Sequence, residues 1–229
     1  MNNQLWNADS RKKDLVKIRN NIQSWSCSGQ DIFVLNKLNF KENGFFIELG
    51  GDDGVRKSNT LTLEENYNWN GIVIEACKEM YNKCLQSRKC IVLNDCIYSE
   101  ETEIDFLDAD GGPSGILGHD NKSENDKIID RVGRTYKIEE KDGPVVLRKK
   151  TKTLNNILEE NNAPQNIDYL SLDVEGAEYE ILKNFSFNKW NIKILSIERP
   201  SHELKNLLFN NNYREICKLN QDVMFIRNV

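Results

Sequence analysis

The sequence contains no long hydrophobic run, no paired cysteine motif and no excess of basic residues, and each absence excludes a class of protein. No apolar stretch approaches the roughly 20 residues that a membrane-spanning helix needs, so we expect no membrane span. Residues 1–10 are polar and lack the basic-then-apolar order of a secretory signal, which favours a cytoplasmic protein with reduced thiols. The six cysteines form no CxxC pair and are accompanied by only two histidines, so no zinc cluster is expected.

The balance of charge excludes a further class of protein. The 229 residues include 31 basic and 36 acidic side chains, for a formal net charge of -5. A protein that grips a phosphate backbone needs a basic surface, and we therefore expect no nucleic-acid partner. Hydrophobic residues make up 38% of the chain and charged residues 29%, a composition typical of a core-forming globular protein.

Short apolar runs alternate with helical patterns along the chain, and this order predicts the fold. Extended segments are expected at 45–49, 72–75, 90–93, 104–107, 169–173 and 192–197, with a closing hairpin formed by 213–219 and 223–226. Helices are expected at 11–22, 32–40, 58–67, 78–86, 153–161, 178–182 and 204–209, and Thr153 is expected to cap the fifth of them. Strands that alternate with helices indicate an α/β fold with a doubly wound, mostly parallel sheet.

We interpret residues 1–229 as a single domain with two additions. Residues 1–43 form an N-terminal helical segment in this interpretation. Residues 110–150 are polar, contain glycines and lack a clear pattern, which suggests an insertion or lid on the acceptor side of a binding site. The dense basic run from Arg148 to Lys152 is interpreted first as a solvated segment.

The predicted strand ends carry the residues in which chemistry is to be sought, because ligands of open parallel sheets bind beyond the carboxyl ends of the strands. These residues are Glu48, Gly50–Gly54, Glu75, Asp95, Asp173, Glu175 and Glu198. Every charged residue among them is acidic, and each carboxylate beside a pyrophosphate would add about 1 kcal/mol or more of repulsion. NAD is therefore disfavoured. The cationic, phosphate-free S-adenosylmethionine suits the acidic glycine turn Gly50–Gly54 better, with Glu75 as the carboxylate that binds the ribose.

Several motifs, in order along the chain, resemble those of the FkbM-type methyltransferases. They are Phe46–Gly54 (FIELGGDDG), Ser58–Thr60, Gly71–Ala76 (GIVIEA) and Ile167–Glu178 (IDYLSLDVEGAE), with Gly29–Asp31 upstream and Ile197–Glu198 downstream. The resemblance spans roughly residues 25–227. It implies a class I, Rossmann-like methyltransferase fold with a seven-stranded sheet whose last strand is antiparallel. It also implies S-adenosylmethionine-dependent O-methylation of hydroxyls on sugars and polyketides.

The same resemblance implies a set of cofactor-binding residues. Those around the methionine part of S-adenosylmethionine and its carboxylate are Glu48, Gly50, Asp52, Gly54, Ser58, Asn59 and Thr60, and Asp173 is a further cofactor-binding residue. Those around the ribose and the adenine are Glu75, Ala76, Asp95 and Cys96. Ser58 to Thr60 open the predicted helix, and helix N-termini attract anions such as a carboxylate.

On the acceptor side, a hydroxyl must be held about 3–3.5 Å from the methyl group and must lose its proton to a base. Asp173 is the best-placed candidate for this base. The next candidates are Glu175, Glu198 and His202 on neighbouring strand ends. Clustered carboxylates raise one another's pKa, which suits a base. The three carboxylates could also hold Mg²⁺, although no metal is assigned. The expected acceptor is a sugar, a nucleotide sugar or a glycan, whose phosphate or acidic group the run from Arg148 could contact.

Three alternatives remain open at this point. Methylation of an amine in a protein or a nucleic acid is one, but amine methylators often carry an Asn/Asp-Pro-Pro-aromatic tetrapeptide where this chain has Asp173-Val174-Glu175-Gly176. A non-catalytic interaction module would bind the cofactor without turnover. A dehydrogenase fits the fold alone and predicts that NAD binds. The sequence indicates neither the oligomeric state nor which hydroxyl is methylated.

Overall fold

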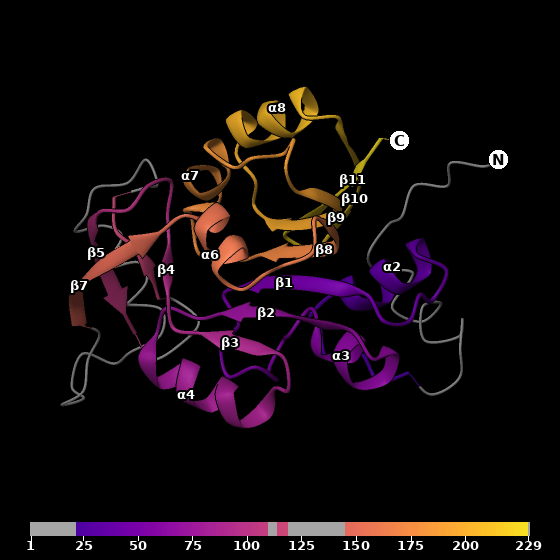
Figure 1. Cartoon of the computed structure of the whole chain (residues 1–229), viewed down its shortest axis with the longest axis horizontal. Helices are drawn as coiled ribbons and strands as arrows, with labels where there is room; N and C mark the ends of the chain where they lie inside the picture. Colours follow the sequence, from indigo (N-terminus) through magenta and orange to yellow (C-terminus); the bar gives the residue numbers. More distant parts are fainter. Residues whose placement is uncertain (1–21, 110–113, 119–144, 229) are drawn as a thin grey trace.

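The computed structural model describes residues 22–109, 114–118 and 145–228. In Figure 1 these residues form a seven-stranded sheet with helices on both faces, beside a smaller four-stranded sheet. The strands of the larger sheet, in the order β10-β11-β9-β8-β1-β2-β3, are β10 (Tyr213–Leu219), β11 (Asp222–Arg227), β9 (Asn191–Glu198), β8 (Asn166–Leu172), β1 (Phe45–Leu49), β2 (Asn70–Ile74) and β3 (Ile91–Leu93). Strands β9, β8, β1, β2 and β3 are parallel, and β11 runs antiparallel to both β9 and β10. The predicted fold class, including the antiparallel last strand, is confirmed.

The helices cover the two faces of this sheet in two groups. Helices α2 (Gln30–Lys37), α3 (Leu61–Tyr67) and α4 (Lys78–Ser87) pack on one face, and α6 (Leu154–Glu160), α7 (Glu178–Lys183) and α8 (His202–Asn210) on the other (Figure 1). Strand β1 shows why both faces are needed, since Ile47 and Leu49 pack against the second group and Phe46 against the first. A strand buried on both faces appears in the sequence as a continuous apolar run. In the part of the chain that the structure describes, every helix is too short or too polar to span a bilayer.

The smaller sheet changes the interpretation of residues 110–150. Its strands, in the order β4-β7-β5-β6, are β4 (Cys96–Ile97), β7 (Val145–Lys152), β5 (Glu103–Asp108) and β6 (Gly115–Ile116). The last six residues of the range expected to be an insertion therefore belong to β7, and these six residues pair with β5. The sequence did not indicate this strand, because the first six residues of β7 do not alternate between apolar and polar and are largely exposed. Most of the expected lid, over 110–113 and 119–144, lies outside the described residues.

The closing hairpin is present as β10 and β11, and the expected helix at 11–22 lies almost entirely outside the described residues. Helix α3 begins at Leu61, three residues later than the pattern predicts. The later start of α3 has a physical cause. Ser58, Asn59 and Thr60 direct polar groups at the carboxylate of Glu48 instead of entering the helix.

The predicted cap of α6 is confirmed and yields a stability test. The Oγ1 of Thr153 accepts a hydrogen bond of 3.1 Å from the backbone N–H of Asn156. Changing Thr153→Ala should lower the free energy of unfolding by about 0.5–2 kcal/mol, because that N–H loses its partner. Urea denaturation measures the change, and Thr153→Ser should retain most of the stability. Equal midpoints for the wild type and the alanine variant would show that the cap does not stabilise the fold.

Candidate functional site

The glycine turn after β1 brings three strand ends into close contact. Gly50 has φ +81°, and a Cβ added there would overlap the backbone O of Asp173. The N–H of Gly50 donates to the O of Ile74 at 3.0 Å, and the N–H of Asp173 donates to the O of Leu49 at 3.2 Å. Only a residue without a side chain fits at Gly50, because the backbone conformation is left-handed and β8 is in contact. The turn therefore joins the ends of β1, β2 and β8.

A cavity of about 540 Å³ lies at these strand ends. The predicted site residues that line it are Glu48, Gly50, Asp52, Ser58, Asn59, Glu75, Ala76, Asp95, Cys96, Asp173, Glu175 and Glu198. Seven carboxylates and three basic side chains are among its lining residues, so the acidic character predicted for the strand ends is present in three dimensions. Three predicted residues are not part of the lining. They are Gly54, which packs toward Cys84, Ser87 and Arg88; Thr60, which is fully buried; and His202, which lies exposed at the start of α8.

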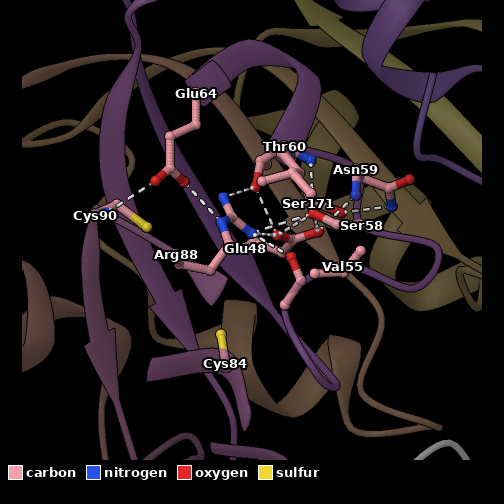
Figure 2. Close-up of polar contacts among 12 residues, drawn as sticks. Glu48, Val55, Ser58, Asn59, Thr60, Glu64, Cys84, Arg88, Cys90 and Ser171 are labelled. Carbon is pink, nitrogen blue, oxygen red and sulfur yellow. Dashed lines mark hydrogen bonds and ion pairs between the residues drawn. The ribbon is translucent and has the colours of Figure 1, made fainter. Parts of the chain in front are cut away.

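Glu48 is the centre of a buried polar network, shown in Figure 2. Its carboxylate accepts hydrogen bonds from the hydroxyl of Ser58 at 3.0 Å, the backbone N–H of Asn59 at 2.7 Å and the hydroxyl of Thr60 at 2.6 Å. The guanidinium of Arg88 donates to the same carboxylate at 3.0 Å. The family resemblance directs the donors of Ser58 to Thr60 at a cofactor carboxylate, but in the structure they are already bound to Glu48.

Arg88 is the partner in this network that the sequence did not reveal. Its side chain is fully buried and also donates to Glu64 at 2.7 Å and to Thr60 at 2.8 Å. The residue lies just after the end of α4, among polar neighbours that have the pattern of a surface segment. The available signal was indirect, because a carboxylate at the end of a buried strand, as predicted for Glu48, requires a cation.

Glu75 ties the glycine turn to the end of β2. One carboxylate oxygen accepts the backbone N–H of Asp52 at 2.8 Å, and the other accepts the N–H of Cys77 at 2.7 Å. Burial raises the pKa of Glu75 to about 7, and the two hydrogen bonds only partly oppose this effect. Each oxygen keeps a lone pair for a further donor, so a molecule in the cavity can bind this carboxylate.

Asp173, Glu175 and Glu198 form an acidic cluster at the ends of β8 and β9. One carboxylate oxygen of each lies within 4.8 Å of the others. Asp173 is surrounded by protein but open to the cavity, and its pKa is raised by burial and then by the charges of Glu198 and Glu175. The direction is the one that clustered carboxylates predict.

The basic run on β7 lies outside the cavity lining. Arg148 donates to Asp105 at 2.9 Å on the exposed side of the smaller sheet, and no residue from Arg148 to Lys152 is among those that line the cavity. The expected contact of this run with an acceptor phosphate has no support in the described residues. Within the part of the chain that the structure describes, the basic side chains that do line the cavity are Arg56, Lys57 and Arg199.

The buried network gives the second test. Changing Arg88→Met should lower the free energy of unfolding by about 3–5 kcal/mol, because Glu48 and Glu64 would stay buried without a cation. The matched control is Arg56→Met, whose pair with Asp52 lies at the surface and should contribute less than about 1 kcal/mol. Chemical denaturation compares the two variants. Similar losses for both would contradict the role assigned to Arg88.

Several solved structures and one family model are similar to this chain. The solved structures with a similar fold include a methyltransferase from Pyrococcus furiosus, at 11% identity with a TM-score of 0.41 over 97% of both chains. They also include the N-terminal domain of human METTL16, at 10% identity with a TM-score of 0.39 over 85% of this chain and 66% of that one. A comparison with curated protein sequences found no match. The family model of the methyltransferase FkbM domain matches residues 48–218, and this chain therefore belongs to the FkbM methyltransferase family.

Proposed function

We propose that this protein is an S-adenosylmethionine-dependent O-methyltransferase that acts on a hydroxyl group of a sugar or glycan. The observation that carries the proposal is the composition of the cavity at the ends of β1, β2, β8 and β9. It combines a glycine turn, a ribose-binding carboxylate and an acidic cluster, and its charge suits a cationic donor that has no phosphate. Family membership supports methyl transfer, and the cofactor and acceptor are part of the proposal.

The residues of the cavity fit the two ends of such a cofactor differently. At the ribose, Glu75 offers two carboxylate oxygens that each have room for a hydroxyl donor. Ala76, Asp95 and Cys96 line the same side and would surround the adenine. At the other end, Glu48 is saturated by protein donors, so we assign it to the support of the turn instead of direct cofactor contact.

Bound S-adenosylmethionine would supply a methyl group already activated on a sulfonium. The protein then has to align the acceptor hydroxyl and to accept its proton. Asp173 lies beside the glycine turn and is open to the cavity, so it is the base of the proposal. Glu198 and Glu175 raise its pKa, and a positively charged donor beside the cluster would lower that pKa again. The base would thus become ionised when the donor is in place.

The ribose contact predicts a dependence of cofactor affinity on pH. The ionised form of Glu75 accepts hydroxyl donors best, so the affinity for S-adenosylhomocysteine should fall as pH is lowered from 8 to 6, through its pKa of about 7. Isothermal titration calorimetry should show a loss of up to about tenfold per pH unit below the pKa. Glu75→Gln should bind weakly at every pH, whereas Glu79→Gln on the exposed side of α4 should behave as the wild type. A pH-independent affinity in the wild type would refute the ribose contact.

The base assignment predicts a separation of rate from binding. Asp173→Asn should lower kcat by about 10²–10⁴-fold, the usual contribution of a general base, with little change in the affinity for S-adenosylhomocysteine. The assay follows transfer of a labelled methyl group from S-adenosylmethionine to a panel of sugars and glycans. Full activity in the variant would remove Asp173 as the base.

A second variant examines the same cluster by its pH profile. Glu198→Gln removes a negative neighbour of Asp173, so the rising limb of kcat against pH should move to lower pH.

Methyl transfer to proteins or nucleic acids alone would favour the amine-methylating alternative. Binding of S-adenosylhomocysteine without transfer to any acceptor would favour the non-catalytic alternative.

A further inference from the structure

Strand β7 contacts three parts of the cavity wall, although it lies more than 50 residues further along the chain than the loops after β2 and β3. The Nζ of Lys149 donates a hydrogen bond of 2.6 Å to the backbone O of Ala76, in the loop after β2. The same ammonium lies 4.9 Å from the centroid of the Phe106 ring. Ala76 and Phe106 both line the cavity, so one lysine fixes two neighbouring parts of its wall.

The same strand also contacts the loop after β3. Lys152 lies 3.6 Å from the carboxylate of Asp95 and 2.8 Å from that of Glu160. Strand β4 pairs with β7 at Cys96 and Thr151, which places Cys96 directly beside the basic strand. Asp95 and Cys96 line the cavity at the end that the proposed function assigns to the adenine. The contacts of β7 therefore converge on the adenine end.

The alternation of the strand separates Lys149 from its neighbours. Lys149 is half-buried and turned toward the cavity wall, whereas Arg148 and Lys150 are exposed on either side of it. Burial raises the pKa of the Cys96 thiol to about 12, and the nearby charge of Lys149 acts in the opposite direction. The Ala76 carbonyl therefore accepts hydrogen bonds from both the ammonium of Lys149 and the amide of Asn94.

We propose that Lys149 is a positioning residue for the cofactor: by holding the Ala76 carbonyl and the Phe106 ring, it shapes the adenine end of the cavity. The inference rests on the proposed function, since it assumes that an adenosyl cofactor occupies this cavity. Lys149 does not contact the reacting atoms. Its removal should therefore affect binding of the adenosine part and leave the chemical step intact.

The test compares Lys149→Met with Lys150→Met, a matched control on the same strand with an exposed side chain. Loss of one charge-assisted hydrogen bond should weaken binding of S-adenosylhomocysteine by about tenfold or more in the Lys149 variant. Binding of 5′-methylthioadenosine, which lacks the amino-acid part, should weaken by the same factor. The KM for S-adenosylmethionine should rise with kcat unchanged at saturation, and Lys150→Met should match the wild type.

Lys149→Arg keeps a cationic donor and should recover most of the affinity, which also answers the case in which the methionine variant fails to fold. Equal binding in the wild type and Lys149→Met would overturn the inference, and so would a loss of kcat with an unchanged KM. An arginine variant that folds but binds no cofactor would overturn it as well. Failure of the wild type itself to bind S-adenosylhomocysteine would instead overturn the proposed function.

Discussion

The buried ion pair between Glu48 and Arg88 is the interaction on which the position of the cavity depends. A carboxylate at the end of a central strand cannot remain ionised in the core without a cation and several donors. Arg88 supplies the cation, and the residues that lead into α3 supply the donors. The pair therefore decides where α3 begins and how the chain leaves the glycine turn. The wall of the cavity at the end of β1 follows from that path.

The carboxylates near the cavity have two different roles. Glu48 is neutralised by Arg88 and surrounded by donors, so it belongs to the framework. Among the residues that the structure describes, no cation is paired with Glu75 or Asp173, and burial raises the pKa of both. Negative charge that the protein leaves uncompensated in a concave site favours a positively charged ligand. The contrast between these residues explains how one strand-end region can be stable and still attract a cation.

The sequence allowed prediction of those elements whose local pattern and packing agree. The apolar runs of β1 and β8 are buried on both faces, and Thr153 caps α6 as its hydroxyl predicts. Arg88 could not be predicted, because an arginine in a polar segment has the pattern of a surface residue and its burial depends on carboxylates 24 and 40 residues away. Strand β7 was missed for a related reason, since its exposed apolar and basic residues do not alternate. The burial of Arg88 and the formation of β7 both depend on contacts with residues that are distant in the sequence.

The central claim is that this cavity binds a cationic adenosyl donor instead of a dinucleotide, and thermal unfolding with the two ligands tests it most directly. S-adenosylhomocysteine at 100 times its Kd should stabilise the protein by about 2.7 kcal/mol, and NAD at the same concentration should leave the unfolding temperature unchanged. Stabilisation by NAD with no effect of S-adenosylhomocysteine would contradict the account.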